Sequence, residues 1–201
     1  MHATTITTMV PERRVLADYL SVSIAAEVAM VTGFAVLIGL SAQVVIPLPF
    51  TPVPITGQTF AVLLGGAALG GRRGFAGGLF YLLAGLAGLP WFYGWSSGYA
   101  GASFGYILAY PVAAALVGWL ASRGLSRHIP GTALAMVAGE SLFYLAGIPW
   151  LMASAHVSLL RGLELGAFPF LPGDALKLVL AIVCLPVAWS VVGRLRGDRQ
   201  H

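Results

Sequence analysis

Long apolar segments separated by short polar ones make up most of this chain, and their lengths fit helices that cross a lipid bilayer. A transmembrane helix needs about 20 predominantly apolar residues, so 201 residues accommodate about six spans and no separate soluble domain. The pattern predicts an all-α membrane protein over residues 21–196, with tails at residues 1–20 and 197–201. The predicted spans cover about residues 22–45, 57–71, 74–89, 102–121, 132–153 and 174–192.

A stretch that is not compatible with a helix follows the first span, at residues 46–60, with prolines at positions 47, 49, 52 and 54. Each proline fixes its own φ and lacks a backbone donor, and each biases the preceding residue toward an extended conformation. Extended backbone among membrane helices is tolerated only where it is buried in protein or lines a cavity. We therefore interpret the stretch as one wall or lid of a small-molecule pocket, with polar side chains from Thr51, Thr56, Gln58 and Thr59. A rigid connector without a ligand is the alternative.

The composition supports a membrane protein and argues against several other classes. Hydrophobic residues make up 58% of the chain and charged residues 9%, whereas soluble domains average about 25% charged residues. The net charge of +4 comes mainly from arginines at predicted helix ends, so it concerns topology and lipid rather than nucleic acid. The sequence contains neither a Gly-x-x-x-x-Gly-Lys phosphate loop nor a metal-ligand set of His and Cys, so we expect no cofactor.

The arginines predict the orientation in the membrane. By the positive-inside rule, the side that carries most of them is cytoplasmic, and both termini lie there. The proline-rich stretch, an aromatic loop at residues 89–99 and the start of the last span then share the outer face, so we expect the pocket to open outward. Of the basic side chains, only Arg161 and Lys177 fall on that outer side. The arginines of the other side are Arg13, Arg14, Arg72, Arg73, Arg123, Arg127, Arg194, Arg196 and Arg199.

A carboxylate and an ammonium group near the start of the last span form a second candidate site. Asp174 and Lys177 are three residues apart, so they share one face of a helix, and Lys177 is the only lysine in the chain. A charge at this depth needs a partner. The two residues either form an internal ion pair, with Asp174 also serving as a helix N-cap, or together bind a neutral polar group of a ligand.

Further candidates come from the fifth span and from the aromatic loop. Glu140 lies inside the fifth span, where a carboxylate is a functional candidate by default, and Tyr144 lies on the same face; a structural acid is the alternative. Trp91 and Tyr93 of the aromatic loop would close over an apolar ring system. The alternative there is an aromatic belt at the membrane surface.

The proline-rich stretch resembles the signature of a known family. Thr51-Pro52-Val53-Pro54-Ile55-Thr56, followed by Gln58-Thr59 and a glycine-rich helix, is similar to the BioY family, the biotin-binding S components of energy-coupling-factor (ECF) vitamin transporters. The motif Pro172-Gly173-Asp174-Ala175-Leu176-Lys177 supports the resemblance, which extends from about Gly33 to the end of the last span. It implies a six-helix S-component bundle with a proline-rich outer loop, in the cell membrane of a prokaryote.

The resemblance also implies roles for individual residues. Asp174 would accept a hydrogen bond from the ureido ring of biotin, and Lys177 would donate one to its carbonyl. The segment ending at Tyr106 matches the family's Gly-Pro-Thr-Gly-Gly-Tyr motif only loosely, and the aromatic loop has no basic residue for the biotin carboxylate, so Arg161 is the substitute that we expect.

The same resemblance implies partner subunits. Ala35 and Gly39 fall where S components carry an Ala-x-x-x-Ala motif that docks the transmembrane coupling subunit (EcfT/BioN-like), although small residues at this spacing also serve internal helix packing. ATP hydrolysis would be supplied by separate ATPase subunits (EcfA/BioM-like), so the chain itself is not expected to be an enzyme. Two alternatives remain open: the same fold with another small vitamin or heterocycle, and an intramembrane enzyme that uses Glu140, Asp174 and Lys177.

Overall fold

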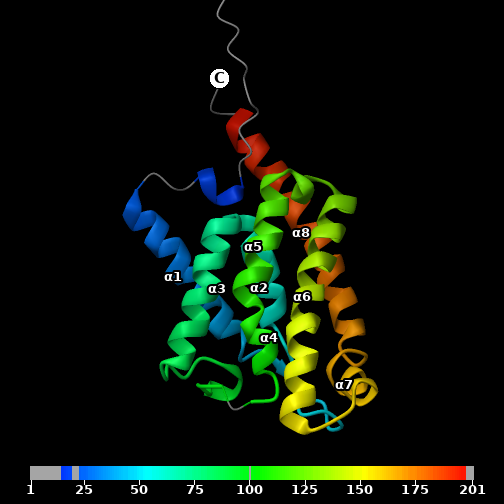
Figure 1. Ribbon diagram of the computed structural model, residues 1–201. Coiled ribbons are helices and arrows are strands. Elements are labelled where there is room, and N and C mark those ends of the chain that lie inside the picture. The colour runs from blue at the N-terminus through cyan, green and yellow to red at the C-terminus, as the bar shows by residue number, and fades with distance from the viewer. Residues whose placement is uncertain (1–14, 20–22, 100, 198–201) are drawn as a thin grey trace, which may run out of the picture.

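The structure is a computed structural model that describes residues 15–19, 23–99 and 101–197, and most of this part of the chain is helical (Figure 1). Its long helices form one bundle, and two short strands lie at one end of it. The elements are η1 (Leu16–Tyr19), α1 (Ile24–Ser41), β1 (Val45–Ile46), β2 (Ile55–Thr56), α2 (Gln58–Leu69), α3 (Gly71–Leu86), η2 (Tyr93–Trp95), α4 (Phe104–Leu108), α5 (Tyr110–Ser122), η3 (Leu125–Arg127), α6 (Ile129–Ala155), α7 (Leu159–Gly166) and α8 (Leu171–Gly197).

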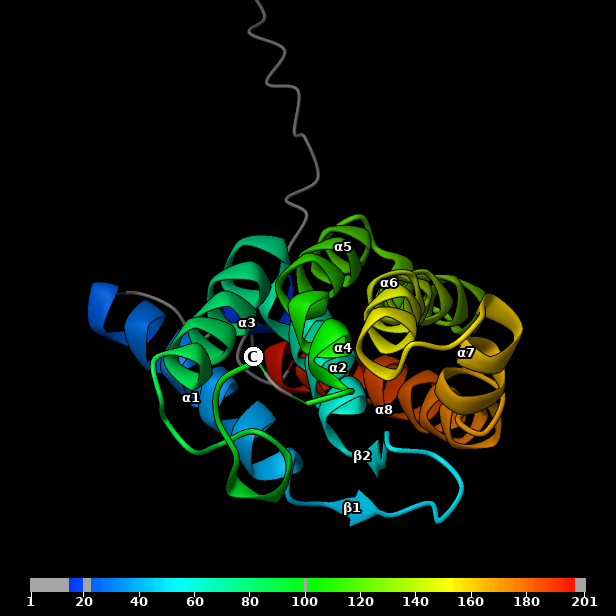
Figure 2. The ribbon, with the colours of Figure 1, turned by 60° about the horizontal axis from the view of Figure 1, so that its bottom comes forward.

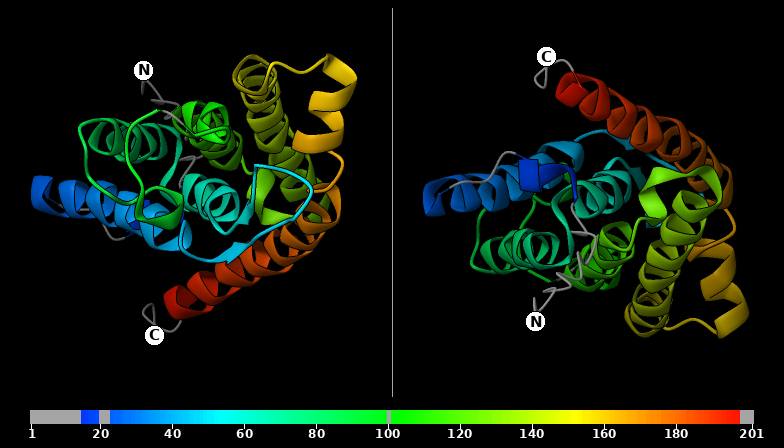
Figure 3. Two further views of the ribbon diagram at one scale, coloured as in Figure 1. Left: turned by 90° about the horizontal axis from the view of Figure 1, so that it is seen from below. Right: turned by 90° about the horizontal axis from the view of Figure 1, so that it is seen from above.

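Seen along its axis, the bundle has α1 and α3 at one side, α6 and α7 at the opposite side, and α2 and α5 between them (Figure 3). α5 packs against α2, α3 and α6, and α8 packs against α6 and α2. The core between these helices includes the fully buried side chains of Tyr81, Tyr110 and Phe143. Their position matters for function, because two of these rings lie beside the pocket described below.

Glycines allow the close approach of α5 to the turn between α2 and α3. Gly70 reverses the chain with a φ of 86°, a left-handed conformation that glycine adopts without steric cost. A Cβ atom on Gly118 would lie 2.4 Å from the carbonyl carbon of Gly70 and 2.5 Å from the backbone nitrogen of Gly71. The turn is therefore made by one glycine, whereas the sequence pattern placed it at Arg72 and Arg73, which lie in the first turn of α3.

Two predicted segments differ from the observed elements. The fourth predicted span is divided into α4 and α5 at Ala109; Pro111 cannot donate the backbone hydrogen bond that a continuous helix would need there. The connection expected at residues 154–172 contains the helix α7, and α8 begins at Leu171, three residues before the span predicted from residue 174. Helix boundaries were thus wrong by a few residues where proline and glycine are part of a helix.

The proline-rich stretch forms a β-hairpin at the same end of the bundle as α7 (Figure 2). The strands β1 and β2 pair antiparallel, with Val45 opposite Thr56 and Ile46 opposite Ile55. The chain between them is irregular, and Thr51 attaches it to α7 by donating a hydrogen bond of 2.6 Å to the carbonyl oxygen of Leu165. The hairpin therefore lies across the end of the bundle with α2 directly after it.

An ion cluster joins three elements at the opposite end of the bundle. The guanidinium of Arg73, on α3, donates hydrogen bonds of 2.6 Å to both carboxylate oxygens of Glu27 on α1. It donates a further bond of 2.6 Å to Asp18 on η1. Because one planar guanidinium serves both acids in a fork geometry, the cluster fixes η1 and the start of α1 against α3.

Among the described residues, three helices are long and apolar enough to cross a membrane: Ile24–Ser41, Ile129–Ala155 and Leu171–Ser190. Gln58–Leu69 and Tyr110–Ser122 are apolar but shorter. A helix of 12 residues is about 18 Å long at 1.5 Å per residue, less than the roughly 30 Å of a hydrocarbon core. A span in this part of the bundle would therefore need the adjoining hairpin, turn or short helix to complete it.

Candidate functional site

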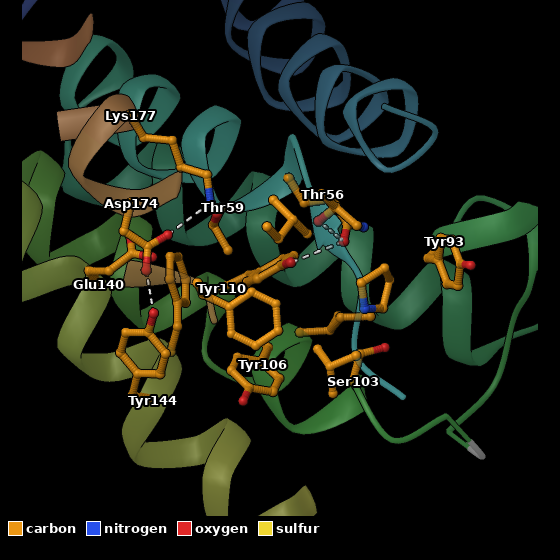
Figure 4. A pocket seen from close by; sticks show the side chains of 17 residues that line it. Thr56, Thr59, Tyr93, Ser103, Tyr106, Tyr110, Glu140, Tyr144, Asp174 and Lys177 are labelled. Atoms are coloured by element: carbon orange, nitrogen blue, oxygen red, sulfur yellow. Dashed lines mark hydrogen bonds and ion pairs between the residues drawn. The ribbon is translucent and has the colours of Figure 1, made fainter. Parts of the chain in front are cut away.

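A pocket lies at the hairpin end of the bundle, between β2, α2, α4, α5, α6 and α8 (Figure 4). Most of its lining is apolar or aromatic, which is typical of small-molecule sites. Most of the residues singled out from the sequence line it, whereas Thr51 and Trp91 do not. The lining residues are Val53, Pro54, Ile55, Thr56, Gln58, Thr59, Tyr93, Ser103, Tyr106, Ile107, Tyr110, Glu140, Phe143, Tyr144, Phe170, Asp174 and Lys177.

Asp174 and Lys177 are brought together by the first turns of α8. Lys177 Nζ lies 3.0 Å from Asp174 Oδ1, and the hydroxyl of Tyr144 on α6 donates a hydrogen bond to Asp174 Oδ2. The side chains of Lys177 and Asp174 are only 18% and 12% exposed. The carboxylate is thus held by two donors inside the chain. It does not act as an N-cap, because the helix begins three residues earlier, at Leu171.

Lys177 has a second partner, Thr59, which is one of the polar side chains expected along the proline-rich stretch. Its ammonium group donates a hydrogen bond of 2.7 Å to the hydroxyl of Thr59 on α2. Thr59 immediately follows Gln58 in the motif after the proline-rich stretch. The contact connects the two motifs in space, although 118 positions separate them in the chain.

Gln58 is the centre of a buried hydrogen-bond network, although we expected its side chain to be a ligand group. Only 3% of it is exposed. Its amide nitrogen donates to the hydroxyl of Tyr81 at 2.5 Å, and its carbonyl oxygen accepts from Tyr110 at 3.1 Å and from Thr56 at 3.2 Å. Since its amide oxygen and nitrogen are both engaged by the chain, Gln58 orients Tyr110 and Thr56 at the pocket. Tyr81 and Tyr110 had no sequence signal, because they lie on helices that meet α2 only in the fold.

Tyr106 and Tyr144 form an aromatic side of the pocket. Their ring centroids are 6.4 Å apart at an interplanar angle of 81°, an edge-to-face arrangement that aromatic pairs favour. The hydroxyl of Tyr106 donates to the carbonyl oxygen of Gly166 at 2.6 Å, which fixes the ring against α7. Tyr93, from the aromatic loop, lines the far side of the pocket and is 38% exposed. The aromatic loop thus contributes Tyr93 to the pocket, while Trp91 packs elsewhere.

Trp91 is partly buried and packs against the core of the bundle. Its indole nitrogen donates to the carbonyl oxygen of Tyr81 at 3.0 Å, and its Cβ lies 3.3 Å from the position that a Cβ on Gly39 would take. Ala35 is fully buried as well. In this structure the residues expected to dock a coupling subunit, Ala35 and Gly39, thus serve internal packing, which was the alternative interpretation. Docking through them stays a prediction.

Glu140, from α6, lies next to Asp174 at the inner side of the pocket (Figure 4). It also lines a second, largely apolar cavity between α2, α6 and α8, together with Phe60, Met136 and Leu178. The residues common to both cavities are Glu140, Tyr144, Asp174 and Lys177. These four residues therefore border both the pocket and the second cavity. Within the part of the chain that was searched, no group of three His, Cys, Asp or Glu side chains could hold a metal ion.

The chain matches a family model and several named relatives. The model described as the BioY family matches residues 11–194. A protein of Pyrococcus horikoshii named "Probable biotin transporter BioY" is 35% identical over 177 residues, which are 87% of this chain and 98% of that protein. A Rhizobium etli protein named "Biotin transporter BioY" is 32% identical over 157 residues, 73% of this chain and 83% of that protein.

A solved structure shares the fold. It is titled as the crystal structure of the S-component for biotin from an ECF-type ABC transporter, and it superposes with a TM-score of 0.72 at 24% sequence identity. The match covers 88% of this chain and 95% of the other. The likeness therefore extends over most of the chain.

Proposed function

Since the chain belongs to the BioY family, we propose that it binds biotin in the pocket at the hairpin end of its bundle and acts as the substrate-binding subunit of an ECF-type ABC transporter. The observation that carries this proposal is the pair Asp174 and Lys177, held at the inner side of an otherwise mainly apolar pocket. We propose biotin as the ligand because the relatives are named as biotin transporters.

The chemistry of the pocket suits the two fused rings of biotin. The ureido ring offers N–H donors and one carbonyl acceptor; a carboxylate is a pure acceptor and an ammonium group a pure donor, so Asp174 and Lys177 match both kinds of group. The two charges neutralise each other. The ion pair can therefore bind a neutral polar ring without burying a net charge of its own. The apolar tetrahydrothiophene ring, which is fused to the ureido ring, would lie against the aromatic rings of Tyr106, Tyr110 and Phe143.

Biotin binding is testable on the purified protein. We expect biotin to co-purify and to be detected by native mass spectrometry, and the biotin-free protein to bind it with a 1:1 stoichiometry in isothermal titration calorimetry. Other small heterocyclic vitamins at the same concentration should give no heat of binding. A protein that retains another heterocycle and ignores biotin would overturn the ligand and leave the S-component fold in place.

We further propose six membrane spans with both termini in the cytoplasm. α1, α2, α3, α4 with α5, α6 and α8 would each cross once. The end of the bundle that carries Arg72, Arg73, Arg123 and Arg127 would face the cytoplasm. The hairpin, α7 and the α3–α4 connection lie together at the other end of the bundle (Figure 2). The pocket lies at that end, so it would take biotin from outside the cell, with ATP hydrolysed by partner subunits.

Cysteine labelling tests this topology. In a Cys184→Ala background, which removes the only native thiol, cysteines at Ser97 and at Ser122 lie at opposite ends of the bundle. A membrane-impermeant maleimide should label Ser97→Cys in intact cells and Ser122→Cys only after the cells are opened. Labelling of both variants in intact cells would contradict the six-span arrangement.

A further inference from the structure

We propose that the valerate tail of biotin ends in a cavity beside the pocket, where the hydroxyl groups of Tyr93, Ser97 and Ser103 bind its carboxyl end without a basic side chain. The inference rests on the proposed function, because it takes the ureido ring to lie at Asp174 and Lys177. It assigns a site to the part of the ligand that the ion pair does not contact, and it predicts which tails the protein accepts.

A cavity of about 330 Å³ adjoins the pocket on the side away from the ion pair. Tyr93, Ser103 and Ile107 line both the cavity and the pocket. Figure 4 shows Tyr93 and Ser103 on the side of the pocket opposite to Asp174 and Lys177. A ligand whose polar ring lies at the ion pair can therefore extend its tail across the pocket into this cavity.

The second cavity, between α2, α6 and α8, also borders the pocket but does not suit a carboxylate. Its lining is largely apolar and includes the acids Glu140 and Asp174. Its one basic group, on Lys177, already pairs with Asp174 at 3.0 Å. A carboxylate there would lie beside other acids and would lose its hydration without gaining a partner. The chemistry of the tail therefore favours the cavity on the other side.

Three hydroxyl groups that line this cavity have no hydrogen-bond partner within the described part of the chain, namely those of Tyr93, Ser97 and Ser103. Ser96, beside them, differs, because its hydroxyl donates to the carbonyl oxygen of Tyr93 at 2.7 Å. Each hydroxyl can donate one hydrogen bond, and hydrogen bonds from hydroxyls to a carboxylate are short and strong. The cavity thus offers donors that the fold itself does not use.

Hydrogen bonds to the helices hold the segments that carry these serines. The backbone nitrogen of Gly98 donates to the carbonyl oxygen of Gly85, in the last turn of α3, at 2.9 Å. The indole nitrogen of Trp150, on α6, donates to the carbonyl oxygen of Gly101 at 3.1 Å. Because both segments are already attached to the bundle, a ligand pays less conformational entropy to order them.

The cavity has no basic side chain among the described residues that line it. Arg161, which the sequence suggested for the carboxylate, pairs with Glu164 at 2.8 Å on the exposed surface of α7 and lines neither the pocket nor the cavity. Tyr93 and Ser97 are exposed, so a carboxylate bound there keeps part of its water and needs no buried counter-charge. A hydroxyl can also accept from an N–H, so an uncharged amide suits the same site.

Two biotin analogues with altered tails test the unaltered protein. The primary amide of biotin should bind within about tenfold of biotin in isothermal titration calorimetry, because the hydroxyls can donate to its oxygen and accept from its N–H. An analogue with a methyl group in place of the carboxyl group should bind at least about tenfold more weakly than biotin. A larger loss with the amide would indicate a cation at the carboxylate, and an undiminished affinity of the methyl analogue would exclude any contact; either result overturns the inference.

Serine variants test the cavity itself. Ser103→Ala removes a hydroxyl but no capping bond, so it should fold normally and weaken biotin about fivefold. The double variant Ser97→Ala/Ser103→Ala should weaken biotin at least about tenfold. The methyl analogue should bind both variants within about twofold of the unaltered protein, because it makes no hydrogen bond that the substitutions remove. Equal losses for biotin and the methyl analogue would mean that the serines only shape the cavity, and would overturn the inference.

Two further variants serve as controls. The hydroxyl of Ser154 donates to the carbonyl oxygen of Leu151 at 3.2 Å, and Ser154 lines neither the pocket nor the cavity. Ser154→Ala and Arg161→Gln should both bind biotin within about twofold of the unaltered protein. A tenfold loss with Arg161→Gln would place its guanidinium at the carboxylate and overturn the inference.

The remaining outcomes keep the inference distinct from the proposed function. If the folded double serine variant binds biotin as the unaltered protein does, the inference fails while biotin binding stands. If the unaltered protein does not bind biotin, the proposed function fails, and the inference fails with it. Should the double variant not fold, as judged by its melting curve and gel-filtration profile, the amide and the methyl analogue decide on the unaltered protein.

Discussion

Replacing Asp174 by Asn should weaken biotin binding at least tenfold, which corresponds to about 1.4 kcal/mol. The amide keeps the shape of the side chain but presents a donor where the carboxylate has only acceptors. It also leaves the ammonium group of Lys177, whose side chain is 18% exposed, without its counter-charge. Removing one partner of a buried ion pair costs about 3–5 kcal/mol, so the melting temperature should fall together with the affinity.

Replacing Lys177 by Met should have a similar effect for the complementary reason. The side chain keeps its approximate length but loses the donor for the ureido carbonyl, and Asp174 keeps only its bond from Tyr144. The bond to Thr59 is lost as well. Isothermal titration calorimetry on detergent-purified protein measures the change in affinity, and a melting curve measures the change in stability.

The double variant Asp174→Asn/Lys177→Met tests whether the ion pair only stabilises the fold or also contacts the ligand. In either case it should fold better than the single variants, because no lone charge remains. If the pair contacts the ureido ring, the double variant should still bind biotin at least tenfold more weakly than the unaltered protein. Recovery of full affinity in the double variant would show that the pair only stabilises the bundle.

Replacing Gly118 by Ala should destabilise the protein more than an ordinary core substitution does. The added Cβ would lie 2.4–2.6 Å from backbone atoms of Gly70, Gly71 and Gly66, so no side-chain rotation relieves the contact. Overpacking typically costs about 1–3 kcal/mol, and a chain of this size loses about 2–4 °C of melting temperature per kcal/mol. We therefore expect a fall of several degrees, measured by differential scanning fluorimetry.

Gly33 supplies the matched control on α1. A Cβ there meets no atom within 4 Å, and Ala is a better helix former than Gly by about 1 kcal/mol. Gly33→Ala should keep or slightly raise the melting temperature. Equal melting temperatures for Gly118→Ala and Gly33→Ala would contradict the close approach of α5 to the α2–α3 turn.

The class of protein and the candidate ion pair of the pocket could be predicted from the sequence. Exposing long apolar segments with few charges to water is unfavourable. Composition and pattern therefore predicted a mainly helical membrane protein. Asp174 and Lys177 were found because two opposite charges three residues apart in an apolar helix must pair with each other or with a ligand. The family was predicted from the proline-rich motif and confirmed by the match over residues 11–194.

The contacts between residues of different helices could not be predicted in the same way. The sequence pattern shows which face of a helix is apolar, but not which other helix packs against that face. It therefore did not predict the hydrogen bond between Lys177 and Thr59, or those of Gln58 with Tyr81 and Tyr110. For the same reason, small residues on α1 suggested a docking face, whereas in the fold Trp91 covers Gly39.

Helix ends were also decided by the fold. Proline and glycine weaken a helix locally, but they are tolerated in the first turn of a helix that packs well, as Pro172 and Gly173 are in α8. Packing energy is a property of the assembled bundle rather than of the segment. The sequence therefore determined which residues carry charge and rigidity, and the packing of the helices determined which of them face one another across the pocket.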